Sequence, residues 1–183
     1  MAPLSSTWCP NITAVGWGQC YPFNNCQSLL RVDLSGLPKL ESIPEKAFGG
    51  CRNLVSVVFG ELSSIANLGP MAFEKCSALT SITLPNKLEV IEDIAFVECT
   101  SLERVVCNKT LETIGGGAFQ TCPKLDFQLA SSSISFGLNP FAACDLLIEI
   151  AAATGFPSNT VAPVGSHGAG ANIGDGIVSY LID

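Results

Sequence analysis

Nine cysteines and a single histidine are the residues of this 183-residue chain with the clearest potential for chemistry. Thiolates and imidazoles are the usual ligands of structural zinc, but the sequence contains no Cys-x-x-Cys pair. Six cysteines instead follow a phenylalanine by three residues, a pattern that favours burial as small apolar side chains. They are Cys26, Cys51, Cys76, Cys99, Cys122 and Cys144. We therefore expect reduced, inert thiols and neither a metal site nor a cofactor.

For the other three cysteines, both buried thiols and disulfides are considered. Cys107 is expected to occupy an inward position on a strand, whereas Cys9 and Cys20 could form one disulfide near the N-terminus. A disulfide between neighbouring repeats is not excluded by distance alone, because adjacent strands of a stack lie about 4.8 Å apart. The large number of thiols nevertheless favours a reducing compartment.

The single histidine, His167, lies in a glycine-rich segment directly after Ser166. A serine and a histidine can form a nucleophile–base pair, but catalysis also needs a third group that orients the imidazole. No such group surrounds this pair in the sequence. We therefore expect a protein that is not an enzyme, and an enzyme that uses Ser166 and His167, or a reactive cysteine, remains a minor alternative.

The Phe-x-x-Cys pattern recurs at intervals of 25, 25, 23, 23 and 22 residues between cysteines. Repetition at this period predicts a solenoid in which each repeat forms one coil. Each Phe-x-x-Cys is expected to form a short helical turn, and the alanine before the phenylalanine is expected where neighbouring coils approach closely. A Leu-x-x-Ile pair recurs between these motifs, at Leu40/Ile43, Leu62/Ile65, Leu88/Ile91 and Leu111/Ile114.

A short alternating segment after each cysteine predicts a strand with apolar side chains on its inner face. The outward residues then form three columns across the coils. The first is Arg31, Ser56, Ser81, Arg104 and Asp126, and the second is Asp33, Val58, Thr83, Val106 and Gln128. The third consists of Ser35, Gly60, Pro85, Asn108 and Ala130. Five strands about 4.8 Å apart and about 10 Å wide project to roughly 240 Å². A standard interface takes about 800 Å² per partner, so this strip alone is small for tight binding.

The repeated motifs resemble the BspA-like, or treponemal-type, leucine-rich repeat over about residues 22–144. The resemblance implies an α/β solenoid, a right-handed superhelix of about five to six coils with a concave parallel β-sheet. Residues 1–21 are then an N-terminal cap. Residues 145–183 are expected to form a C-terminal helix over Asp145–Ala153, a Gly-rich loop and the start of a further helix, so the chain could be truncated. Proteins with such repeats include bacterial surface adhesins and many protist proteins.

Charge and hydropathy restrict the partners and the compartment. The net charge is −7, and no basic cluster could neutralise a row of phosphates, so we expect no binding to nucleic acid. No apolar run reaches the roughly 18–20 residues of a membrane span, and the N-terminus lacks the features of a signal peptide. We expect a cytoplasmic monomer. The alternative is a cell-surface or secreted protein whose export signal is missing from this sequence.

The repeat architecture and the lack of a catalytic constellation predict a non-catalytic module that binds a protein or peptide through its concave sheet face. The second hypothesis is a structural or adhesive surface array of repeats, of which this chain is a fragment.

Overall fold

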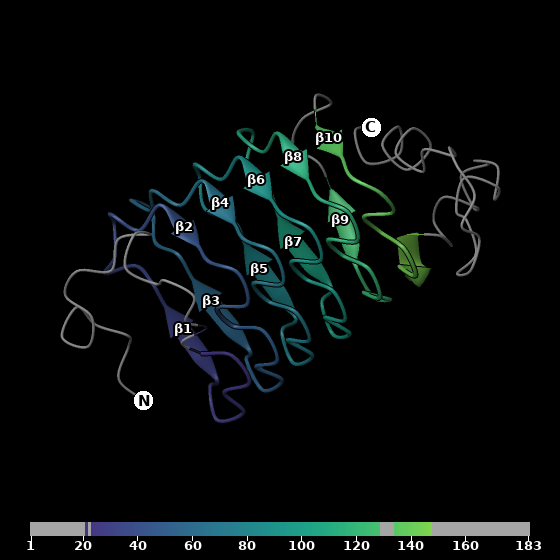
Figure 1. Ribbon diagram of the computed structural model, residues 1–183, viewed down its shortest axis with the longest axis horizontal. Helices are drawn as coiled ribbons and strands as arrows, with labels where there is room; N and C mark the ends of the chain where they lie inside the picture. The colour runs from purple at the N-terminus through teal and green to yellow at the C-terminus, as the bar shows by residue number, and fades with distance from the viewer. Residues whose placement is uncertain (1–20, 22, 129–133, 148–183) are drawn as a thin grey trace.

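The computed structural model describes residue 21, residues 23–128 and residues 134–147, and it forms a solenoid of parallel strands (Figure 1). Strands from successive coils form two stacks. The first stack contains β1 (Arg31–Asp33), β3 (Ser56–Val58), β5 (Ser81–Thr83), β7 (Arg104–Val106) and β9 (Asp126–Gln128). The second contains β2 (Ser42–Ile43), β4 (Asn67–Leu68), β6 (Val90–Ile91), β8 (Thr113–Ile114) and β10 (Ser135–Phe136). Five strands in a stack span four full turns, so the coil count is slightly lower than expected.

The two stacks differ in continuity. All strands of the second stack pair in parallel in one sheet, in the order β10-β8-β6-β4-β2. The first stack is divided into a β1-β3 sheet and a β5-β7-β9 sheet, with no ladder between β3 and β5. The strands predicted after each cysteine are therefore present. The Leu-x-x-Ile region forms a second set of strands that was not predicted from the sequence.

Each coil has a front half and a back half, which we define by their residues. The front half carries the strand of the first stack and its flanking loops. The back half carries the strand of the second stack and the Phe-x-x-Cys turn. Front halves are residues 27–39, 52–64, 77–87, 100–110, and 123–128 with 145–147; back halves are 40–51, 65–76, 88–99, 111–122 and 134–144.

A column of phenylalanine rings runs through the back halves. Consecutive rings from Phe23 to Phe119 stack with centroids 5.1–5.4 Å apart and planes within 14° of parallel, and Phe119 and Phe141 stack at 5.6 Å. The four rings from Phe48 to Phe119 are fully buried. Each coil thus covers the ring of the coil before it, which makes burial in one repeat dependent on its neighbour.

The ladder cysteines are hydrogen-bonded between coils. From Cys51 onward, each thiol donates to the phenylalanine carbonyl oxygen of the preceding coil, at distances of 2.9–3.3 Å. The backbone N–H groups of Cys51, Cys76, Cys99 and Cys144 also donate to the phenylalanine carbonyl of their own coil, as from Cys99 to Phe96 at 3.2 Å. The prediction of small buried side chains holds for these five cysteines, whereas Cys26 is only partly buried. The thiol is in addition a donor that alanine would not supply.

The Phe-x-x-Cys segments are successive turns and not helical turns as predicted. The residue before each ladder cysteine has a positive φ, which reverses the backbone and prevents a right-handed helix from propagating. These residues are Asn25, Gly50, Lys75, Glu98, Thr121 and Ala143, with φ between 55° and 72°. Among the described residues only Asp145–Leu147 are α-helical, at the start of the helix predicted over residues 145–153.

The closest backbone approach between coils occurs at glycines after the second-stack strands. A Cβ built on Gly115 would lie 2.5 Å from Asp93 N and 2.6 Å from Glu92 C, and a Cβ on Gly69 would lie 2.8 Å from Glu45 N. The alanines that the sequence placed at such contacts are fully buried. A side chain larger than hydrogen would therefore not fit at Gly69 or Gly115 without a local shift of the neighbouring coil.

One leucine of the Leu-x-x-Ile pattern lies outside the core. Leu62 is 81% exposed, whereas Ile65 and Leu68 are buried. Ile65 follows Cys51 by 14 residues, as Leu40 follows Cys26 in the coil before, so Ile65 and Leu68 occupy the inward positions of this coil. Leu62 therefore lies on the projecting loop and not in the core.

Candidate binding face

The predicted outward residues align along the first stack in the expected register, although Ser56 is only half-exposed and its Oγ is buried with no hydrogen-bond partner among the described residues. Arg31 aligns with Ser56, and Asp33 aligns with Val58, across β1 and β3. Ser81, Arg104 and Asp126 align across β5, β7 and β9, as do Thr83, Val106 and Gln128. The residues between them are buried: Val32, Val57, Ile82, Val105 and Phe127. We call the outward surface of this stack the strand face.

The acidic side chain at the N-terminal end of the strand face is held by its own turn. Ser35 Oγ and Ser35 N–H both donate to Asp33 Oδ1, at 2.6 and 3.0 Å. These two hydrogen bonds, with a smaller contribution from the positive charge of Arg31, lower the pKa of Asp33. Asp33 is therefore an ionised acceptor with a fixed orientation.

A shallow hollow of about 740 Å³ lies at the C-terminal end of the strand face. Its walls include Ser81, Arg104 and Asp126 of the first column. Glu103, Lys124 and Asp145 from the adjoining loops complete its charged lining. Because it contains both cations and carboxylates, this hollow has no strong preference for ligand charge.

A second hollow, of about 320 Å³, lies where the first stack is interrupted. The Leu34 N–H donates to Val58 O at 2.7 Å, and Leu84 N–H donates to Val106 O at 3.0 Å. Among the described residues no equivalent bond joins Phe59 N–H to Thr83 O. The hollow opens at this position between Val58 and Gly60 on one side and Thr83 and Pro85 on the other. We call it the junction hollow.

The cysteines are not arranged for chemistry. All seven in the described residues are free thiols, and none of the disulfides left open for them is formed. Burial raises the pKa of Cys51 to about 11 and that of Cys107 and Cys144 to about 12, and it raises the pKa of Cys76, Cys99 and Cys122 further. A thiol with a raised pKa is a poor nucleophile at neutral pH because the thiolate is rare.

The remaining predictions from the sequence concern metal ligands, membrane spans and residues that lie outside the described part of the chain. In the described part of the chain, no three His, Cys, Asp or Glu residues are grouped so that they could hold a metal ion. Within the same residues, no helix is both long and apolar enough to cross a membrane. Ser166, His167, Cys9 and Cys20 lie outside the described residues, as do the predicted cap and most of the C-terminal region.

Comparison with known proteins identifies the type of repeat. The BspA type leucine rich repeat region matches residues 19–148 with six copies, which is more than half of the chain. The chain therefore belongs to the BspA-type leucine-rich repeat family, and the resemblance seen in the sequence is confirmed. No curated protein matches the sequence.

Solved structures share this fold. The Treponema pallidum leucine-rich repeat protein has 26% sequence identity and a TM-score of 0.59, over 81% of this chain and 77% of that one. The pneumococcal vaccine antigen PcpA has 25% identity and a TM-score of 0.54, over 63% of this chain and 28% of that one. A leucine rich cell surface protein from Faecalibacterium prausnitzii, 21% identical with a TM-score of 0.51, covers 62% of this chain and supports the fold alone. The match spans only 36% of that protein.

The sequence reading missed two features of the strand face. It did not predict the interruption between β3 and β5, nor the junction hollow beside it. A signal was present in the repeat lengths, because the repeats starting at Cys26 and Cys51 are two residues longer than the two that follow. The interruption separates the long coils from the short ones.

Proposed function

We propose that this protein is a non-catalytic recognition module that binds a protein or peptide through its strand face. One observation carries the proposal. The outward residues form columns in register on each of the two sheets of the first stack, while every intervening side chain is buried. A partner can therefore contact several coils at once through side chains that the fold does not need for its core.

The contact residues would be the ten of the first two columns: Arg31, Asp33, Ser56, Val58, Ser81, Thr83, Arg104, Val106, Asp126 and Gln128. Val58 and Val106 are 42% and 46% exposed and offer apolar contact, while the arginines and aspartates offer charge. The loops of the front halves would enlarge the surface beyond the narrow strip of strands, as a standard interface of about 800 Å² per partner requires. The module would act as a monomer.

A second candidate function is a surface or adhesive array. It is supported by one neighbour, PcpA, which is described as a pneumococcal vaccine antigen. In this case the chain would be one part of a longer array exposed outside the cell, and the predicted cytoplasmic location would be wrong. Detection of the intact protein on the surface of unlysed source cells would decide between the two locations.

The strand face is tested by a pull-down from source-cell lysate with the wild-type chain beside the Arg31→Ala/Asp33→Ala/Arg104→Ala variant. Both proteins must first show the same thermal unfolding midpoint. We expect at least one partner to bind the wild type and to be lost by the variant. If the variant retains every partner that the wild type binds, the strand face is not the recognition surface.

A further inference from the structure

Charge is distributed unequally between the two halves of the coils. The front halves contain seven of the nine Lys and Arg residues and five acids, a net charge of +2. The back halves contain two lysines and eight acids, a net charge of −6. The cations of the front halves are Arg31, Lys39, Arg52, Lys87, Arg104, Lys109 and Lys124. The net charge of the front halves is therefore weakly positive, although the net charge of the whole chain is negative.

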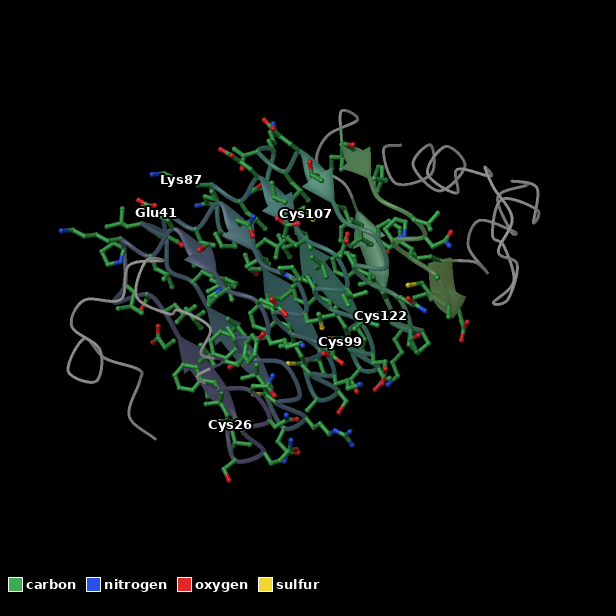
Figure 2. All side chains as sticks on the ribbon, in the orientation of Figure 1. Cys26, Glu41, Lys87, Cys99, Cys107 and Cys122 are labelled. Atoms are coloured by element: carbon green, nitrogen blue, oxygen red, sulfur yellow. The ribbon has the colours of Figure 1, made fainter. Side chains whose placement is uncertain are left out.

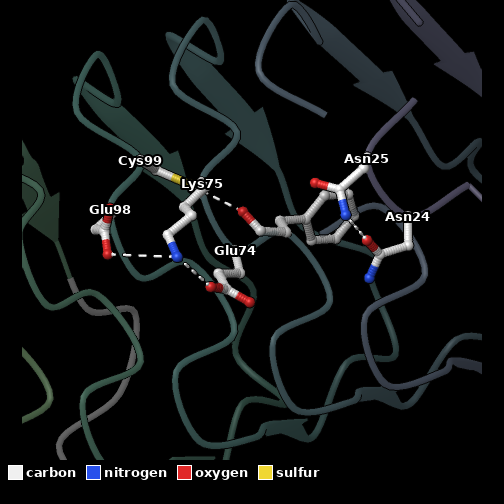
Figure 3. A network of polar contacts seen from close by, with 7 residues as sticks. Asn24, Asn25, Glu74, Lys75, Glu98 and Cys99 are labelled. Atoms are coloured by element: carbon white, nitrogen blue, oxygen red, sulfur yellow. Dashed lines mark hydrogen bonds and ion pairs between the residues drawn. The ribbon is translucent and has the colours of Figure 1, made fainter. Parts of the chain in front are cut away.

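The two halves also differ in how their cations are paired. In the back halves Lys75 Nζ lies 2.9 Å from Glu74 Oε1 and 3.8 Å from Glu98 Oε1 (Figure 3). Lys46 Nζ likewise lies 3.6 Å from Glu45 Oε1. No front-half cation forms an ion pair with another described residue. The front cations are thus available to a partner without the loss of an internal ion pair.

Three of the front-half lysines lie on loops that connect the two stacks. Lys39, Lys87 and Lys109 are exposed on the loops after β1, β5 and β7, and the corresponding loop after β3 contains Glu61. Figure 2 labels Lys87 at the edge of the molecule, with Glu41 labelled beside it in this view. The exposed glutamates that follow the lysines, Glu41, Glu89 and Glu112, belong to the back halves at the start of the second stack.

The front halves also expose apolar surface in three places. Val58 and Val106 are part of the second column, Leu62 is 81% exposed on its projecting loop, and the junction hollow is lined by Val58, Thr83 and Pro85 together with Glu61. Exposed apolar side chains near charged groups that lack an internal ion pair are typical of a recognition surface, because apolar side chains do not interact favourably with water. A long polyanion without apolar groups would leave this hollow unused.

From these observations we infer that the partner of the strand face is an acidic polypeptide segment with interspersed apolar side chains. Its carboxylates would pair with the front-half cations, and one apolar side chain would enter the junction hollow. The acidic back would repel the same segment and so favour docking on the front. This inference rests on the proposed function and adds the chemistry of the partner to it.

Two labelled peptides test the charge preference on the full chain by fluorescence anisotropy. The probe is fluorescein-labelled Glu-Val-Glu-Leu-Glu-Val-Glu, and its counterpart has lysine in place of every glutamate. We expect binding of the acidic peptide at about 20 mM NaCl, weaker binding at about 200 mM NaCl, and weaker or no binding of the lysine peptide. Equal or tighter binding of the lysine peptide would overturn the inference.

Two double variants with the same change in net charge locate the site. Lys87→Gln/Arg104→Gln removes two unpaired front cations, whereas Lys46→Gln/Lys75→Gln removes the two paired back cations. The front variant should weaken binding of the acidic peptide about fivefold, and the back variant less than about twofold. Equal effects of the two variants would mean that only the overall charge matters, which contradicts the inference.

The apolar part of the inference has its own test. A third peptide, Glu-Ser-Glu-Ser-Glu-Ser-Glu, has the same charge and no apolar side chains, and it should bind several-fold more weakly. If it binds as well as the first peptide and heparin displaces both, the front is a general polyanion site and the partner is not an acidic apolar segment.

The outcome separates this inference from the proposed function. If the pull-down partner depends on Arg31, Asp33 and Arg104 but the acidic peptide does not bind, the strand face stands and its charge preference is wrong. If the acidic peptide binds through Lys87 and Arg104 while the triple variant keeps all partners, the front has the inferred chemistry but natural recognition occurs elsewhere.

Discussion

The first four back halves of the coils all contain 12 residues, from residues 40–51 to residues 111–122, whereas the corresponding front halves contain 13, 13, 11 and 11. The back halves form an uninterrupted five-stranded sheet, contain the stacked rings and pair their lysines. The front halves have an interrupted stack, exposed valines and unpaired cations. The difference indicates that the back halves hold the more regular part of the core, although front-half side chains such as Ile82 and Val105 are also buried, and that the front halves vary in length and in surface chemistry.

The largest effect on stability should come from alkaline pH, because it acts on many buried thiols together. Burial raises the pKa of Cys76, Cys99, Cys107, Cys122 and Cys144 from an ordinary value near 9, and four of these thiols lie in back halves. Above pH 9 the unfolded state loses these protons while the folded state keeps them, so the free energy of unfolding falls as pH rises. Each thiol contributes up to about 1.4 kcal/mol per pH unit.

Urea unfolding at pH 8, 9 and 10 measures this dependence. Stability should change little between pH 8 and 9 and fall steeply between pH 9 and 10. The Cys99→Ala variant should start from a lower stability and lose less of it per pH unit. An unfolding midpoint that stays constant up to pH 10 would show that the thiols are accessible in the folded protein.

The next largest effect should come from a ring at the centre of the phenylalanine column. Phe96 lies 5.2 Å from the Phe73 ring and 5.1 Å from the Phe119 ring, and it is fully buried. Phe96→Ala should lower the free energy of unfolding by about 3–5 kcal/mol. Val58→Ala on the front should change it by no more than about 0.5 kcal/mol. Similar losses for both variants in urea unfolding would contradict the division between the two halves.

The sequence predicted most of the fold because the repeated motif consists of the residues that the core requires. Phe73, Cys76 and Leu79 are all fully buried, as their spacing indicated. The second stack was missed because its strands are only two residues long, too short for alternation to be seen. The helical turns were wrongly predicted because residues such as Lys75 and Glu98 give no sequence signal for a positive φ.

The alignment of the outward strand residues was predictable from the sequence, but the charge and shape of this surface were not. Periodicity of two places Arg104 and Val106 on one face of a strand, and the structure has them so. The division of charge could not be read from the linear sequence, since Lys87 and Glu89 are two residues apart yet belong to different halves of one coil. The junction hollow depends on how a long coil stacks on a short one, which no single repeat encodes.

A smaller effect on stability is expected at the close contacts between coils. A glycine in a front-half loop provides the matched control. Gly115→Ala would place a Cβ 2.5 Å from Asp93 N, so the coils must separate locally, at a cost of about 1–3 kcal/mol. Nothing lies within 4 Å of a Cβ on Gly36, so Gly36→Ala should be neutral or stabilise by up to about 1 kcal/mol. Thermal unfolding of both variants provides the comparison. A neutral Gly115→Ala would mean that the back halves tolerate wider spacing.

The smallest effect is expected at Leu62, where the sequence pattern and the structure disagree most. If Leu62 were the inward leucine of its repeat, truncation would cost about 2–5 kcal/mol. Because it is 81% exposed on a front loop, Leu62→Ser should change the free energy of unfolding by less than about 0.5 kcal/mol. Ile65 is 1% exposed, so Ile65→Ala should instead show the full core penalty. Urea unfolding of this pair decides which residue fills the core of the longer coil. A large loss at Leu62 with a small one at Ile65 would restore the register predicted from the motif and remove the projecting loop from the front.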